Sequence, residues 1–128
     1  MSQHDFALEP RTSTVAGMSV LAQVTADKSK DSWDVTIVFS RAVGLPPMQA
    51  EEVDAQLIDT RGKAKPVVER PSGPLVEFGG SLGNSVNASF RFHDSRLEPG
   101  ELVVTCRGET ARFRVVSGGG SEGGQVKP

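Results

Sequence analysis

Three arginines near the C-terminal end of the chain are the side chains whose spacing most favours a binding function. Arg112 and Arg114 lie two positions apart, and Arg107 precedes them across a short turn. Residues two apart on a β-strand share one face of the sheet. Guanidinium groups on one face can receive the carboxylates of an acidic protein surface or an anionic polymer, and Arg91 extends the patch if its strand is near. The alternative is that these are ordinary surface arginines balanced by nearby glutamates.

The loop Gly44-Leu-Pro-Pro-Met48 is a second candidate binding element, because its prolines stiffen the backbone and its apolar side chains are expected to be exposed. Loops at the end of a β-sandwich often carry binding residues. The alternative is an ordinary crossover between two sheets. Combined with the arginines and two outward residues of the strand before Arg107, the loop completes the predicted contact surface: Val103, Thr105, Arg107, Arg112, Arg114, Leu45 and Met48.

The other reactive residue types do not form a catalytic or metal-binding pattern. His93 is followed by Asp94 and Ser95, but neighbours on a strand point to opposite faces, so these three residues do not form a nucleophilic triad. No Cys and His spacing typical of zinc occurs. The single cysteine, Cys106, excludes an internal disulfide and is expected to be a buried apolar residue. We therefore predict a non-enzymatic protein with no metal and no cofactor.

Composition narrows the classes of partner. The chain has 128 residues, which fits one domain, and is 37% hydrophobic and 23% charged. Its net charge of −2 argues against nucleic acid or an anionic membrane as the main partner. No stretch is long enough to span a bilayer. The first residues lack the pattern of a signal peptide, which predicts a cytoplasmic protein, or an extracytoplasmic one if a signal has been removed.

The elements that must position the candidate residues are β-strands. Residues 102–116 read as a hairpin, and a two-residue turn at Gly108-Glu109 pairs Cys106 with Ala111, Val104 with Phe113 and Leu102 with Val115, so that these apolar pairs share one face. Further alternating runs predict strands and two short, proline-bounded edge strands. The strands are expected at 18–25, 33–39, 53–57 and 86–92, and the edge strands at 67–68 and 75–76.

The chain therefore divides into a flexible N-terminal arm (residues 1–14), a β domain (15–117) and a flexible Gly-rich tail (118–128). About seven short strands at regular spacing, with no convincing amphipathic helix, predict an antiparallel β-sandwich. The large apolar residues of the strands are expected between its two sheets: Trp33, Ile37, Phe39, Leu57, Phe90, Phe92, Val104 and Phe113.

Three segments resemble strands of bacterial immunoglobulin-like domains. Residues 35–43 resemble their apolar-x-Phe-Ser-x-x-Val strand, residues 57–63 their Leu-x-Asp-x-x-Gly strand end, and residues 97–104 their Leu-x-Pro-Gly-x-Tyr-x-Val corner. The resemblance covers residues 17–116 and implies an immunoglobulin-like antiparallel β-sandwich of about seven strands. Leu102 stands where that family usually has Tyr. The metal ligands of the family's copper carriers are not carried over, because His4 is not the first residue.

These observations favour a non-catalytic accessory or scaffold domain that binds another protein through an outward sheet face and the adjoining loop. Edge-strand pairing would also allow a homo-oligomer. The alternative function is an extracytoplasmic ligand-binding module, either a metal carrier or a carbohydrate binder.

Overall fold

The computed structural model describes residues 3–42, 45–80, 83–94 and 99–116, which form ten β-strands and two 3-10 turns. No α-helix occurs among them, so the all-β prediction is confirmed. Accordingly, none of these segments forms a helix that is long and apolar enough to cross a membrane. The elements are β1 (Gln3–Glu9), β2 (Thr12–Val15), β3 (Met18–Asp27), η1 (Lys28–Lys30), β4 (Ser32–Arg41), η2 (Ala50–Glu52), β5 (Val53–Asp59), β6 (Val67–Glu69), β7 (Val76–Gly80), β8 (Gly83–His93), β9 (Pro99–Cys106) and β10 (Glu109–Val116).

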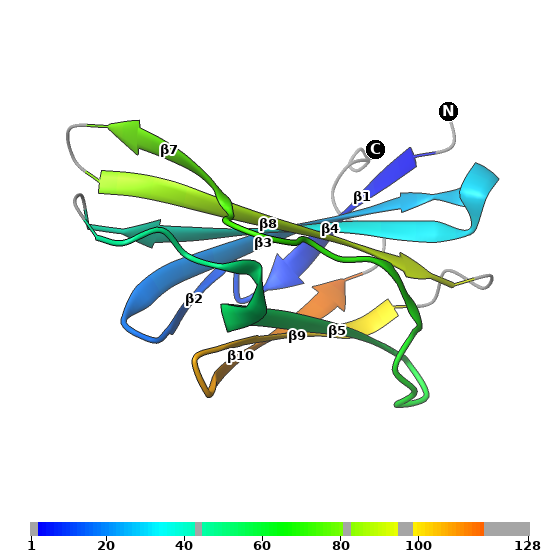
Figure 1. Cartoon of the computed structure of the whole chain (residues 1–128). Helices are drawn as coiled ribbons and strands as arrows, with labels where there is room; N and C mark the ends of the chain where they lie inside the picture. The colour runs from blue at the N-terminus through cyan, green and yellow to red at the C-terminus, as the bar shows by residue number, and fades with distance from the viewer. Residues whose placement is uncertain (1–2, 43–44, 81–82, 95–98, 117–128) are drawn as a thin grey trace.

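The strands form one antiparallel sheet in the order β5-β9-β10-β1-β3-β4-β8-β6, with β2 added to β3 and β7 added to β8. The sheet curls so that its two halves face one another (Figure 1). We call β5, β9 and β10 the smaller layer, and β2, β3, β4, β8, β7 and β6 the larger layer. The short edge strands expected around residues 67–68 and 75–76 are present as β6 and β7.

Strand β1 connects the layers, so the predicted flexible arm over residues 1–14 is wrong for its described part. Its first half, Gln3 to Phe6, pairs with β3, and its second half, from Ala7, pairs with β10. The Phe6 ring lies 4.8 Å from the ring of Trp33, and Leu8 is buried. Pairing with β3 and β10 holds β1 in place, which the polar sequence of this segment does not predict. The predicted Gly-rich tail, residues 118–128, lies outside the described residues.

The β9–β10 hairpin exists, but its predicted register is wrong by two residues. The turn is Arg107-Gly108, so Cys106 pairs with Glu109 rather than Ala111. Both turn residues have positive φ, 52° and 84°, as a type I′ turn requires. Arg107 is held in this conformation because its N–H donates to the Glu52 carbonyl at 3.2 Å. A shift of two residues preserves the faces, so the apolar positions still point inward.

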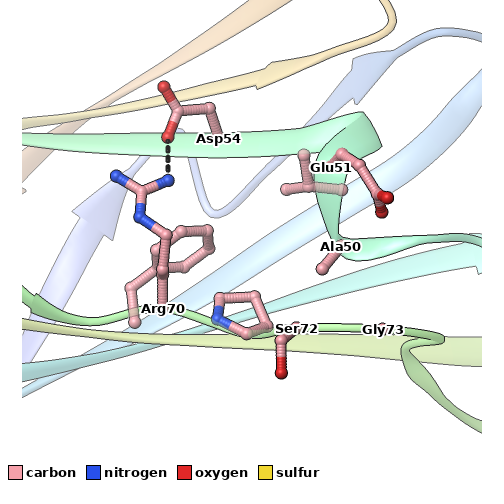
Figure 2. Close-up of a pocket in the computed structure, with 9 residues that line it drawn as sticks. Ala50, Glu51, Asp54, Arg70, Ser72 and Gly73 are labelled. Carbon is pink, nitrogen blue, oxygen red and sulfur yellow. Dashed lines mark hydrogen bonds and ion pairs between the residues drawn. The ribbon is translucent and has the colours of Figure 1, made fainter.

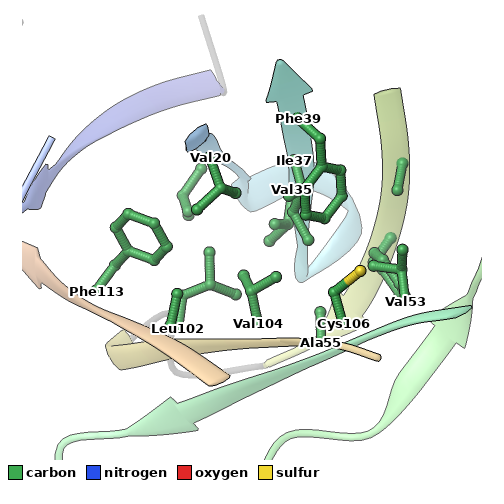
Figure 3. Packing of buried hydrophobic residues seen from close by; sticks show 14 of the residues in the cluster. Val20, Val35, Ile37, Phe39, Val53, Ala55, Leu102, Val104, Cys106 and Phe113 are labelled. Carbon is green, nitrogen blue, oxygen red and sulfur yellow. The ribbon is translucent and has the colours of Figure 1, made fainter. Parts of the chain in front are cut away.

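The core lies between the two layers (Figure 3). All eight large residues predicted for the core are buried, and so is Cys106. They are buried because strand alternation sends every second side chain of each layer toward the other. The labelled side chains that meet there come from the larger layer (Val20, Val35, Ile37 and Phe39) and from the smaller layer (Val53, Ala55, Leu102, Val104, Cys106 and Phe113).

A buried ion cluster joins the ends of the two layers. The Lys65 Nζ lies 3.2 Å from Asp59 Oδ2, at the end of β5, and 3.1 Å from Asp94 Oδ1, just after β8. Both carboxylates are almost fully buried. The backbone N–H of Lys63 donates to Asp59 at 2.9 Å and, with Arg61 and Lys65, lowers the pKa of Asp59 from 3.8 to about 2, against the opposing effect of burial. The cluster therefore holds charged groups where the layers meet.

We expect this carboxylate to make the fold sensitive to acid. Because the folded pKa of Asp59 is lower, the unfolded chain binds more protons between pH 3.8 and about 2. The contribution of Asp59 to stability is therefore complete above that window and is lost as pH falls through it. Urea unfolding at several pH values should show this fall in the wild type and a flatter dependence in Asp59→Asn. The control Asp54→Asn removes an exposed carboxylate and should keep the wild-type fall, since Asp59 remains; equal slopes in both variants would contradict the assignment.

Candidate functional site

The three arginines of the predicted contact surface are exposed on the smaller layer, but each is paired with a glutamate. The pairs are Arg107–Glu52 at 2.6 Å, Arg112–Glu101 at 3.2 Å and Arg114–Glu9. Arg91 does not extend this group, because it lies on the larger layer, where it pairs with Asp34 at 2.8 Å and Glu69 at 3.1 Å. We call the outer side of the β9–β10 hairpin, with Val103, Thr105, Arg107, Arg112 and Arg114, the hairpin face. It is charge-balanced and is not a basic stripe.

Two apolar residues of the predicted surface, Val103 and Met48, are buried, so their expected exposure is wrong. Val103 is on the outer side of its strand, yet only 6% exposed, because it lies between Gln56 and Arg112 in register and long side chains on both neighbours can cover it. Thr105 is half-buried. The hairpin face therefore offers less apolar contact area than the sequence indicates.

The loop after β4 is likewise split between surface and core. Leu45 is 50% exposed, as predicted, whereas Met48 is 1% exposed and belongs to the core cluster. The Met48 carbonyl accepts a hydrogen bond from the N–H of Leu75 at 2.8 Å. This bond ties the loop to the segment before β7 and carries the Met48 side chain between the layers. Residue 44 of this loop lies outside the described residues.

A different surface has the properties of a binding site: the outer face of the larger layer. Strand pairing aligns its outward side chains in three rows across β3, β4, β8 and β7. All of them are apolar, hydroxyl or amide side chains. The rows are Ser19, Ser40, Ser85 and Phe78; Leu21, Val38, Asn87 and Val76; and Gln23, Thr36 and Ser89. We call these eleven residues the neutral face.

Three of the four apolar side chains of the neutral face are exposed, and the fourth, Val38, is half-buried. Leu21 is 42% exposed, and Val76 and Phe78 are each 59% exposed. Strand β7 reverses the usual arrangement of apolar residues inside and charged residues outside, because Val76 and Phe78 point outward. Glu77, between them, is half-buried and accepts a hydrogen bond from Asn84 Nδ2 at 2.6 Å. Apolar groups in water cost free energy, and gathered patches of them mark interaction sites.

Charged residues begin at the next row and bound the neutral face on one side. Asp34 and Arg91 are opposite one another on β4 and β8, and Arg91 also reaches Glu69. The hydrogen bond to Asp34 and its charge raise the pKa of Arg91, with a smaller effect from Glu69. Beside them, the Thr25 hydroxyl donates to Asp5 at 2.8 Å. These contacts form a paired polar border along one side of the uncharged face, and the rims of protein interfaces are likewise polar.

Hollows lie where the segment between β6 and β7 leaves β8. This segment turns to the smaller layer, where the N–H of Ala50 donates to the Gly73 carbonyl at 2.8 Å. A cavity of about 530 Å³ opens between this segment and the start of β5. The Arg70 side chain reaches across it to Asp54 at 3.2 Å (Figure 2). A second hollow of about 340 Å³ is lined by neutral-face residues, including Phe78. It could accept an apolar side chain of a partner.

Among the described residues, no group of three or more His, Cys, Asp or Glu side chains gathers that could hold a metal ion. Burial raises the pKa of the Cys106 thiol, which disfavours the nucleophilic thiolate. His93 is exposed at the end of β8. Comparisons with protein-family models, with curated proteins and with solved structures found no match.

The neutral face escaped the sequence analysis because no single segment reveals it. The outward serines and Asn87 of β8 are visible in its alternation, but their alignment with Leu21 and Val38 depends on strand order. The sequence does not predict a strand at Phe78, because the two glycines that follow it indicate a loop. One signal in the sequence could have indicated this strand. The apolar residues Val76 and Phe78 alternate with Leu75, Glu77 and Gly79, so they share one face of an extended segment.

The hairpin face should contribute to stability through packing rather than charge. We expect Val103→Ala to lower the free energy of unfolding by about 2 kcal/mol, since it removes two buried methyl groups and leaves a gap. Arg112→Gln should change it by less than about 1 kcal/mol, because it removes the charge but keeps a long side chain beside Val103, and exposed ion pairs contribute little. Urea unfolding of both variants measures the difference. The reverse order of the two effects would show that charge dominates this face.

Proposed function

We propose that this protein is a non-catalytic protein–protein interaction domain and that the neutral face is its contact surface. The observation that carries the proposal is the exposure of Val76 and Phe78, 59% each, on a face of eleven uncharged residues. Interface centres are depleted in charge and enriched in aromatic residues. A partner that covered these side chains would remove their apolar area from water, with little charge to desolvate.

The proposal moves the contact surface away from the hairpin face predicted from the sequence. Arg107, Arg112 and Arg114 already have glutamate partners, so a new acidic partner would have to replace contacts that exist. The eleven residues of the neutral face are uncharged, so a partner that binds there has no ion pairs of these residues to replace. The resemblance to bacterial immunoglobulin-like domains remains part of the proposal, supported by antiparallel strands in two facing layers.

Two double variants with the same change in net charge separate the two surfaces. Leu21→Glu with Val76→Glu places charge on the neutral face, and Arg112→Gln with Arg114→Gln removes charge from the hairpin face. We expect a partner captured from the native host's lysate by the wild type to be lost with the first variant and retained with the second. Quantitative mass spectrometry of the captured proteins, with circular dichroism to confirm folding, measures this.

The other possible results would move the contact surface or refute the proposal. A partner lost with the arginine variant alone would return the site to the hairpin face. Retention of every captured protein by both variants would refute both surfaces. The absence of any protein enriched by the wild type would refute the interaction function itself.

Carbohydrate binding is a second candidate function, favoured by one observation. The exposed Phe78 ring lies in a row with Ser85 and beside Asn87, so an apolar platform adjoins hydroxyl and amide groups that can bond to sugar hydroxyls. Trp33 cannot serve as this platform because it is fully buried. A glycan array should then show wild-type binding that Phe78→Ala abolishes. An array with no signal above background would eliminate this candidate.

A further inference from the structure

The free edge of β7 sets it apart from the other ends of the sheet. Strand β7 pairs with β8 and with no other described strand. The opposite end, β5, is covered by the chain that follows it: Asp59 donates its N–H to the Lys63 carbonyl, and Lys65 donates to the Leu57 carbonyl, both at 2.8 Å. Two other edge strands among those described are shorter than β7: β2, which pairs only with β3, has four residues, and β6, which follows a proline, has three. The β7 backbone is therefore open to another strand.

Strand β7 also lacks most of the features that usually protect an edge. Proteins block edges with lysine, proline, bulges or inward charges that a new neighbour would bury. The five residues Val76–Gly80 contain no lysine and no proline, and their pairing with β8 is regular. The one charge, Glu77, is already bonded to Asn84. Its outward residues are apolar, so this edge attracts a partner strand instead of repelling it.

We propose that the occupant of this edge is a second copy of the same chain, paired β7 to β7 in antiparallel fashion across a two-fold axis. Such an isologous pair uses one patch twice and closes on itself. It joins the neutral faces of both copies into one continuous sheet surface. The inference rests on the proposed function, because it names a partner for the larger layer, which carries the proposed contact surface.

The sequence of β7 selects one register for this pair. An axis at Phe78 aligns all five residues, with Val76 opposite Gly80 and Glu77 opposite Gly79 of the other copy. The two Phe78 rings then face one another as a cross-strand aromatic pair, which is favourable. An axis at Glu77 would set two carboxylates directly opposite, which is unfavourable. It would also bring Pro74, which has no N–H to donate, into the pairing.

Charge supports a second copy at this position. The chain has a net charge of −2, so two copies repel weakly overall. The neutral face is the part of the described surface where eleven outward residues carry no charge, so approach there costs least. In the next row, Asp34 and Arg91 are paired with each other, and Arg91 is also paired with Glu69.

Sedimentation velocity over a range of concentrations tests the dimer. The wild type should form a dimer whose dissociation constant rises at least ~tenfold in Phe78→Lys, because two ammonium groups would replace the aromatic pair. Val68→Lys makes the same kind of change at an apolar residue of β6 that is as exposed as Phe78, 59%, but lies outside the neutral face, and it should leave the constant within about threefold of the wild type. A monomeric wild type at every concentration, or an equal loss in both variants, would overturn the inference.

Variants with one added cysteine test the register. At the axis, Phe78→Cys places two Cα atoms about 4.5–5.5 Å apart, within the span of a disulfide. Val76→Cys places its two copies four positions out of register, beyond that span. Oxidation should therefore yield covalent dimer from Phe78→Cys and not from Val76→Cys, with the native Cys106 buried in both. Equal cross-linking of the two variants would overturn this register.

The dimer and the proposed function fail in different ways. A monomeric wild type that still captures a partner sensitive to Leu21→Glu with Val76→Glu refutes the second copy and keeps the interaction function. A monomeric wild type that captures nothing refutes both.

Discussion

The backbone pairing of β1 is the constraint on which the rest of this structure depends. One strand donates and accepts hydrogen bonds with β3 over its first half and with β10 over its second half, and so joins two layers into one curled sheet. Backbone groups that turn away from water must find partners, and β1 supplies them for both layers on the same side of the molecule. This side is closed by main-chain bonds and needs no further element.

The opposite side has no shared strand, and other contacts close it. Lys65 links the ends of β5 and β8, and Arg70 pairs with Asp54 across the gap. Between them the chain leaves β8 near residue 70 and bonds to the segment around Ala50 before it returns as β7. The detour interrupts the edge of the larger layer. Strand β7 is left as a short separate edge with Val76 and Phe78 outward, so the closure of the core also creates the surface proposed to bind.

Local patterns predicted the parts of this fold that depend on alternation within one segment. Trp33, Ile37 and Phe39 are buried because every second residue of β4 points inward, and the sequence shows that period directly. The failures have a common cause in contacts between segments. Strand β1 is ordered by β3 and β10, and the turn at Arg107 is held by Glu52. Neither partner is visible in the local sequence.

The same distinction explains why the candidate site moved from one layer to the other. Arginines spaced two apart indicate a charged face, but the net charge of a face depends on the neighbours that strand pairing brings, and here each arginine meets a glutamate. Serine, asparagine and valine at outward positions carry little signal one strand at a time. Aligned across four strands, they form a continuous uncharged surface with an exposed phenylalanine at its edge. Because the arginines already have partners and these apolar groups do not, burial of the neutral face has the larger free energy to gain.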